Sequence, residues 1–314
     1  MARNAGVGFG LVLLVMLLSA LPSLLSDYTL SFAINTLAYV VLATAWVLFS
    51  GATRYISLAS AAFFGVGAYT VAVLGEVLPL YAVFAVALAI GLAIALLIGL
   101  STLRISGMHF VIFSFGLTEL VRQLTIWWEI NNTRTLGRFV SVEFDNVAIY
   151  HHLLGLAILV YLSGWLLGRS RLGFALRVIG EDEQVARQVG IDTPRAKLAV
   201  FALSALFMTA TGAVMAPRWN YINPNIAFNP DVSVQVVIMA LLGGIGRLWG
   251  PALGVIPLAI LSELLSTRFP QGYVILLGLV FMAVIYVLPQ GLAGATETLW
   301  RRRKRTAAQR PEGT

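Results

Sequence analysis

The chain has 314 residues, of which 59% are apolar and only 11% are charged, and its mean hydropathy is +0.88. A soluble domain carries about 25% charged residues, so this composition excludes an ordinary soluble protein and indicates a chain whose solvent is lipid. The net charge of +7 comes from basic residues at the ends of apolar segments and in the tail, where anionic lipid and membrane topology explain it better than nucleic acid does.

Ten segments meet the requirement of about 20 mainly apolar residues for a membrane helix. They are predicted at 7–25, 29–49, 56–75, 79–101, 108–128, 148–168, 198–216, 232–249, 251–267 and 272–289. The first is longer than the apolar core of a signal peptide, which is about 7 to 15 residues, so we expect it to be retained. We therefore predict an all-α integral membrane protein with one transmembrane domain, residues 1–300, and a basic cytoplasmic tail, residues 301–314.

Two of these segments contain glycine-rich stretches. Residues 56–75 are rich in small residues, which let helix backbones approach closely in lipid. We expect this third segment to be buried among other helices, and whether it crosses fully or is re-entrant stays open. Residues 243–251 contain four glycines and a Gly-Pro step, so they predict a sharp turn, after which Pro251 starts the next helix.

The basic residues predict the orientation in the membrane. With the N-terminus inside, 16 of the 21 Lys and Arg residues fall in inner segments and four in outer segments, while Arg122 lies within a span. This bias places both termini and the loop 169–197 in the cytoplasm. We expect the protein to lie in the bacterial inner membrane.

The loop 169–197 is the longest polar stretch between two spans, with six basic and four acidic side chains. Residues 180–190 are predicted to form a short helix, with three acids in the first turn, where the helix dipole favours them. Val185 and Val189 lie one turn apart and form a small apolar face. The stretch is either a solvated connection or a docking element for another protein. The candidate docking residues are Glu181, Asp182, Glu183, Val185, Arg187 and Gly190.

Two outer loops, 129–146 and 218–231, also stand out. The aromatic residues Trp219 and Tyr221 in the second loop are typical of an interfacial belt. The alternative is a surface that receives a delivered substrate.

Few ionisable side chains fall inside the predicted spans, where charge is costly. Glu119 and Arg122 are three residues apart on one helical face and can pair. The pair is either structural or part of a translocation path. Glu263 is the single acid without an evident partner in the sequence, and it gives thin support to an ion-coupled transporter.

Catalytic motifs are missing from the sequence. The only lysines are Lys197 and Lys304, and neither follows a glycine, so the chain has no P-loop. Zinc-site spacing and the Gly-x-Ser-x-Gly elbow are absent too. With no cysteine, the chain cannot form a thiolate site. We expect that it is not an enzyme by itself and binds no metal or cofactor.

Four stretches, taken together, resemble a known family. They are residues 51–69, 103–122, 175–197 and 243–251, the last closed by 289–292. In this order they are similar to the M-type permease subunit of branched-chain amino acid ABC importers, and they spread over most of the chain. The resemblance implies a type II importer fold of about ten helices, with two permeases side by side around a central pathway.

The resemblance also implies partners and roles. The expected partners are a second permease, forming a heterodimer, two ATPases that bind ATP and Mg²⁺, and a solute-binding protein that meets the outer loops. The loop 169–197 would be the coupling helix that seats in the ATPase. Beyond the resemblance, we expect the close-packed segment around Gly65 and Gly67 and the turn 243–250 to line or gate the path. The candidate pathway residues are Phe63, Phe64, Gly65, Gly67, Glu119, Arg122, Gly243, Gly244 and Gly246.

Two departures from the family pattern concern the substrate. Residues 133–138 stand where relatives often have a glycine-rich run, and Met108-His109 stand where relatives often have an acidic or small residue. The cargo is expected to be a branched-chain or related amino acid, with urea, short amides or small organic acids as alternatives. An ion-coupled transporter and a membrane scaffold without a pathway are the alternatives from other classes.

Overall fold

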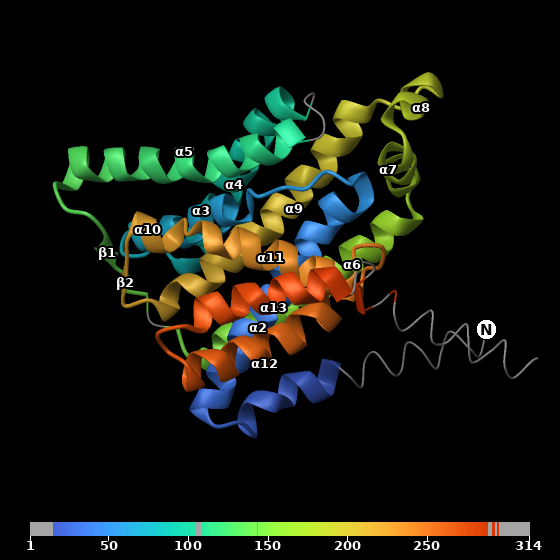
Figure 1. The fold of residues 1–314 in the computed structure, drawn as a ribbon. Helices are drawn as coiled ribbons and strands as arrows, with labels where there is room; N and C mark the ends of the chain where they lie inside the picture. Colours follow the sequence, from blue (N-terminus) through green and yellow to red (C-terminus); the bar gives the residue numbers. More distant parts are fainter. Residues whose placement is uncertain (1–14, 104–107, 143, 288–290, 293, 295–314) are drawn as a thin grey trace, which may run out of the picture.

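The computed structural model describes residues 15–103, 108–142, 144–287, 291–292 and 294, and it is a bundle of helices (Figure 1). The helices are α2 (Asp27–Trp46), α3 (Ser60–Leu74), α4 (Leu80–Thr102), α5 (Met108–Thr133), α6 (Asn146–Arg169), α7 (Arg171–Glu181), α8 (Glu183–Gln188), α9 (Thr193–Met215), α10 (Pro224–Ala227), α11 (Pro230–Gly243), α12 (Gly250–Arg268) and α13 (Tyr273–Val287). Two short strands, β1 (Arg138–Phe139) and β2 (Tyr221–Ile222), pair antiparallel.

Within the described residues, seven helical segments are long and apolar enough to cross a membrane. They are Asp27–Gly51, Leu80–Thr102, Met108–Thr133, Asn146–Arg169, Thr193–Arg218, Pro224–Gly243 and Gly250–Arg268. The chain is therefore a multi-pass membrane protein, although the predicted count of ten spans is not confirmed. Helices α3 and α13 have 15 residues each. Residues 7–14 of the predicted first span lie outside the described residues, as do Arg104, residues 289–290 and the basic tail.

Helix α3 lies in the middle of the bundle, and its side chains from Ser60 to Ala72 are all buried. At 1.5 Å per residue it is about 22 Å long, shorter than the roughly 30 Å hydrocarbon core. Burial of the third segment is confirmed. Its helix starts four residues later than the predicted span, because residues 54–59 are not helical.

The close approach of α3 and α9 depends on glycine at two positions. A methyl group added at Gly67 would lie 1.9 Å from the carbonyl oxygen of Thr209, and one added at Gly212 would lie 1.9 Å from that of Phe64. The two backbones therefore touch, as small residues permit in membrane helices.

The glycine-rich turn between α11 and α12 is confirmed. Gly244 has φ of 101°, which favours glycine, and Pro251 stands in the first turn of α12. A methyl group on Gly243 would lie 2.1 Å from the carbonyl oxygen of Gly250. Helix α11 ends at Gly243, so the prediction that this span continues to residue 249 was wrong.

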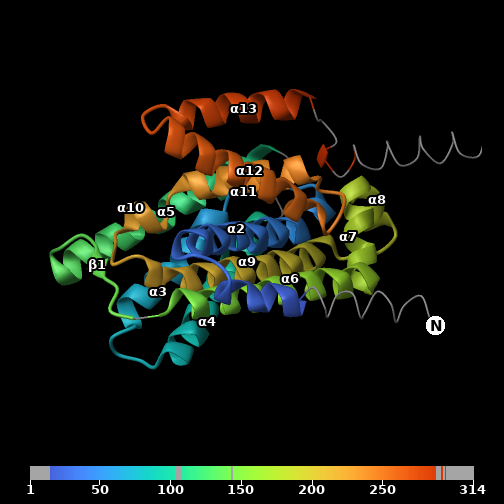
Figure 2. The same cartoon turned by 90° about the horizontal axis from the view of Figure 1, so that it is seen from below.

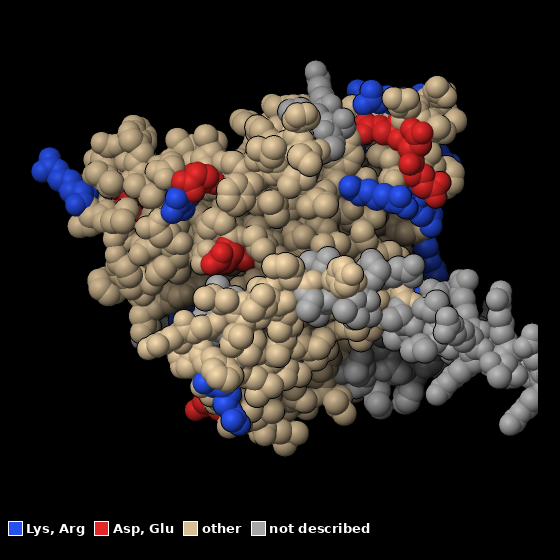
Figure 3. Space-filling view, in the orientation of Figure 1, with Lys and Arg blue, Asp and Glu red and all other residues tan. Residues whose placement is uncertain are grey.

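The polar loop and the strand pair lie at opposite ends of the bundle (Figures 1 and 2). Helices α7 and α8 are at one end, and β1 and β2 are at the other. On the face shown in Figure 3 the body of the molecule is mostly uncharged, and the largest group of charged side chains lies over α7 and α8.

Candidate functional site

The loop 169–197 folds into two helices rather than one. Helix α7 ends at Glu181, and Asp182 is extended and caps α8, because its Oδ1 accepts hydrogen bonds from the backbone N–H groups of Gln184 (2.7 Å) and Val185 (3.2 Å). The prediction that three acids share the first turn of one helix was therefore wrong. Glu181 ends α7, Asp182 is the cap, and only Glu183 is in the first turn of α8.

The end of α8 follows the prediction. Gly190 has φ of 82°, and its N–H donates to the carbonyl of Arg187 at 3.1 Å. The N–H of Ile191 donates to the carbonyl of Ala186 at 3.0 Å. These two bonds form a Schellman motif, in which a left-handed glycine closes the helix. The short helix is therefore fixed at both ends by its own residues.

Helix α8 has one side toward the body and an apolar side toward the outside. Ala186 is buried, whereas Val185 is 46% exposed and Val189 is 66% exposed. Phe174 on α7 is exposed as well. Exposed apolar groups beside charged ones, at the end of a membrane bundle, are suited to contact another protein.

Glu183 points into the protein, unlike its neighbours Glu181 and Asp182, which are exposed. Its Oε2 accepts a hydrogen bond from the Tyr55 hydroxyl (2.5 Å), and its Oε1 accepts from Lys197 Nζ at 2.9 Å. Arg187 and Thr193 also donate to Oε1, at 2.8 and 3.1 Å. Burial alone raises the pKa of Glu183, but the hydrogen bonds from Tyr55, Lys197 and Arg187 outweigh it and lower the pKa to about 2.

Tyr55 and Lys197 were not among the predicted site residues. Lys197 is 1% exposed and places its ammonium 4.5 Å from the centre of the Tyr55 ring. The sequence did hold a signal for Lys197, because a lysine at the start of an apolar span is a candidate for a buried, paired charge. Nothing in the sequence placed Tyr55, which is 142 residues away from it.

The predicted pair of Glu119 and Arg122 is confirmed. The guanidinium donates to both carboxylate oxygens, at 2.9 and 2.6 Å. It also donates to the side-chain oxygen of Asn225 on α10 at 2.7 Å, and Gln123 donates to Glu119 at 2.7 Å. This polar cluster lies half-exposed in the middle of α5, so it is open to a partner or a pathway.

Six of the other seven predicted pathway residues lie in close-packed places, and Gly246 does not. Phe63 and Phe64 are buried, and their rings contact Phe201 and Trp219. A methyl group on Gly65 would meet the ring of Phe228 at 2.3 Å. Gly246 is exposed, and a methyl group added there would have no neighbour within 4 Å, whereas Gly243 and Gly244 are buried. That these residues line or gate a path stays a prediction.

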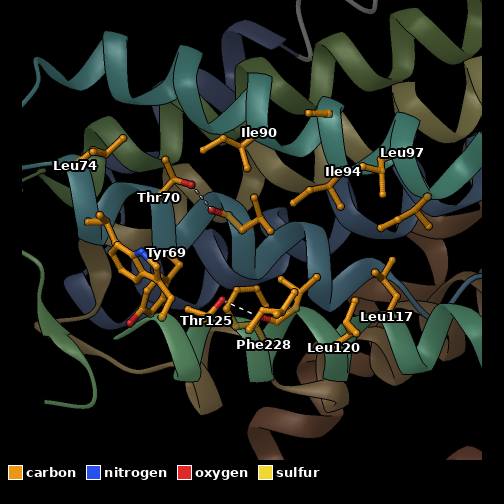
Figure 4. A pocket seen from close by; sticks show the side chains of 17 residues that line it. Tyr69, Thr70, Leu74, Ile90, Ile94, Leu97, Leu117, Leu120, Thr125 and Phe228 are labelled. Carbon is orange, nitrogen blue, oxygen red and sulfur yellow. Dashed lines mark hydrogen bonds between the residues drawn. The ribbon is translucent and has the colours of Figure 1, made fainter. Parts of the chain in front are cut away.

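A cavity of about 680 Å³ lies between α3, α4 and α5. Figure 4 shows Ile90, Ile94 and Leu97 of α4 facing Leu117 and Leu120 of α5 across it. None of the nine residues predicted for the pathway lines this cavity in the described part of the chain. The cavity is apolar, so it can hold hydrocarbon groups but offers few hydrogen bonds.

The two loops predicted to be outer, 129–146 and 218–231, are far apart in sequence but form one surface. Strand β1 pairs with β2, with Arg138 opposite Ile222 and Phe139 opposite Tyr221. The rings of Phe139 and Tyr221 are 5.4 Å apart, and Phe139 is 74% exposed. The Tyr221 hydroxyl also donates to the carbonyl of Leu136.

No group of three or more His, Cys, Asp or Glu residues that could hold a metal ion occurs among the described residues. The predicted lone acid Glu263 has a partner, because the Tyr28 hydroxyl donates to it at 2.5 Å.

These features define a multi-pass helical membrane protein with a structured polar loop at one end of its bundle. The sequence matches, over residues 28–286, the family described as "Branched-chain amino acid transport system / permease component". The chain belongs to this family, so it is a permease component of a transport system.

Individual relatives agree with this family. The chain is 28% identical to the high-affinity branched-chain amino acid transport system permease protein LivM of Escherichia coli K12, over 91% of this chain and 75% of that protein. It is 27% identical to LivH of the same organism, over 54% of this chain and 53% of LivH. It is 30% identical to the autoinducer 2 import system permease protein LsrC of Yersinia pestis, over 38% of this chain and 33% of LsrC. No solved structure matches the chain.

Proposed function

We propose that this chain forms half of the translocation pathway of an ABC importer for branched-chain or related amino acids. Two relatives whose names state this cargo, LivM and LivH, support the proposal, and LivM aligns over 91% of the chain. Urea, short amides and small organic acids are not favoured by these names. The second permease would be a LivH-like chain, forming a heterodimer with this one.

The observation that carries the coupling proposal is the geometry of α8. The helix is fixed at both ends, holds Ala186 against the body and leaves Val185 and Val189 exposed. We infer that two ATPases, which bind ATP and Mg²⁺, dock on the α7–α8 loop. A rigid element such as α8 transmits motion only if the ATPase contacts it differently in the ATPase's two conformational states.

The paired outer loops support docking of a solute-binding protein at the opposite end. Two exposed aromatic side chains, Phe139 and Tyr221, would be its contacts, since aromatic residues dominate many interfaces. This arrangement requires the α7–α8 loop in the cytoplasm, as the basic residues predict, with both termini on that side of the inner membrane.

Uptake in proteoliposomes tests the proposal. The chain, a LivH-like permease, two ATPases and the binding protein should together take up radiolabelled leucine when ATP is enclosed with the ATPases. Uptake by the chain alone, driven by an ion gradient, would instead indicate a secondary transporter. Absence of any substrate-dependent change in ATP hydrolysis in the complete complex would indicate a scaffold without a pathway.

A further inference from the structure

The stretch between α2 and α3 departs from regular α-helical geometry. A π-helix, Val47–Gly51, follows α2, and residues 54–59 belong to no helix. Arg54 takes φ of 58°, which is uncommon and costly for a residue other than glycine. π-Helical turns and left-handed residues are concentrated at functional sites.

Within this stretch, the backbone of Ser57 and Leu58 is hydrogen-bonded to side chains of three helices. Ser114 of α5 accepts from the Leu58 N–H at 2.8 Å, and Ser233 of α11 donates to the Leu58 carbonyl at 2.8 Å. Trp46 of α2 donates to the carbonyl of Ser57 at 2.7 Å. Such irregular backbone is tolerated in a membrane only where protein surrounds it.

The same stretch contacts the α7–α8 loop directly. Tyr55 donates to Glu183 at the start of α8, and Lys197 of α9 donates to both Glu183 and the Tyr55 hydroxyl. Helix α7 lies against the backbone beside Tyr55, because a methyl group on Gly180 would be 2.4 Å from the carbonyl oxygen of Ala52. Figure 1 shows the stretch as the blue trace between α3 and the end of α2.

We propose that Tyr55 and Lys197, through Glu183, are the positioning residues that pass movement of the α7–α8 loop to residues 54–59. From there the movement reaches α5, which holds the Glu119–Arg122 cluster, and α11, which leads into the glycine turn. This inference rests on the proposed function, because it names the path by which ATPase docking reaches the pathway.

A buried charged group bonded on both sides is suited to this role. Lys197 is 1% exposed, so separating it from Glu183 would leave a buried charge without a partner, which is strongly unfavourable. The contact between the loop and the stretch 54–59 is therefore stronger than the contact made by an exposed ion pair, such as that of Arg195 with Asp192. The loop moves together with the stretch.

The test uses Tyr55→Phe in the complete complex, because this change removes one hydroxyl and keeps the ring. The measured quantity is leucine taken up per ATP hydrolysed. We expect this ratio to fall about ten-fold, because the free energy of a hydrogen bond to a charged group commonly corresponds to about a ten-fold change in an equilibrium constant. Tyr161→Phe is the matched control, because its hydroxyl bonds to the neutral Thr44, and this variant should retain the wild-type ratio.

A second measurement separates transmission from stability. The chain has no cysteine, so Ile56→Cys, whose native side chain is 41% exposed, gives a single spin-label site beside Tyr55. In the complex, ATP with vanadate should change the label's mobility, and Tyr55→Phe should abolish this change. Lys197→Met should abolish it too, and Lys197→Arg should restore part of it.

The outcomes distinguish this inference from the proposed function. Wild-type uptake per ATP in Tyr55→Phe, or a spin-label response that is absent in the wild type or unchanged in the variant, would overturn the inference alone. A wild-type complex that shows no leucine-dependent ATP hydrolysis would overturn the proposed function itself.

Discussion

The guanidinium of Arg138 lies 3.1 Å from the carboxylate of Glu129, whose side chain is fully buried. The N–H of Gly137 donates to the other carboxylate oxygen at 2.8 Å. This pair fastens the loop after α5, and with it strand β1, to the end of α5.

Arg138→Met should lower the stability of the protein by about 3 kcal/mol, because removing one partner of a buried pair leaves the other charge uncompensated. Thermal unfolding in detergent, followed by tryptophan fluorescence, measures the loss. The double variant Arg138→Met with Glu129→Gln should regain part of it. A single variant as stable as the wild type would show that the pair is not coupled to the fold.

Val185→Asp combined with Val189→Asp should reduce co-purification of the ATPases by at least about ten-fold, because two exposed apolar contacts would be replaced by charges that must be desolvated. Gln188→Asp, on the same short helix, is the control for added charge and should have a smaller effect. Equal recovery of the ATPases with the double variant would argue against docking on this face.

Gly67→Ala should destabilise the protein by about 1–3 kcal/mol, because the added methyl group overpacks the contact with α9. Gly116→Ala is the matched control on α5, since a methyl group there meets nothing within 4 Å. It should be neutral or slightly stabilising, as expected for alanine in a helix. Thermal unfolding measures the stability of both variants. Equal unfolding temperatures for Gly67→Ala and Gly116→Ala would contradict the close contact between α3 and α9.

Acid should loosen the α7–α8 loop in a defined window. The pKa of Glu183 is lowered from 4.5 to about 2, so its contribution is complete above about pH 4.5 and is lost as the pH falls toward 2. A spin label at Val189→Cys should therefore gain mobility across this window. The same label in a Glu183→Gln background should lack this step, and identical titrations in both would exclude Glu183 as the group responsible.

Single cysteines at Val189 and Phe139 should be labelled from opposite sides of the membrane. Val189 caps the end of α8 and Phe139 is in β1, these two elements lie at opposite ends of the bundle, and both side chains are exposed. A membrane-impermeant maleimide applied to intact spheroplasts should reach the Phe139 site only. Labelling of both sites from outside would contradict the predicted topology.

Helix positions were largely predictable, because lipid requires long apolar runs. The predicted spans 79–101 and 148–168 differ from α4 and α6 by at most two residues at either end. The predicted helix boundaries were wrong where a capping side chain or a glycine ended a helix. Asp182 caps α8 through its own side chain and so breaks the polar helix, which is a known competing role of aspartate. Gly243 ends α11 before the apolar run ends.

The candidate site was only partly predictable. The pairing of Glu119 with Arg122 follows from helical spacing alone. The inward direction of Glu183 does not, because its partner Tyr55 is 128 residues away in the chain and periodicity carries no information about such a contact. Exposure of Val185 and Val189 required the fold, since the sequence shows only that they share a face.

The mutual contact of Gly67 with Thr209 and of Gly212 with Phe64 has a mechanical consequence. Neither α3 nor α9 can turn about its own axis without driving side-chain atoms into the facing backbone. The two central helices are therefore expected to shift as one rigid body during a transport cycle, so that a change of access between the two sides of the membrane would come from movement of the surrounding helices relative to this pair.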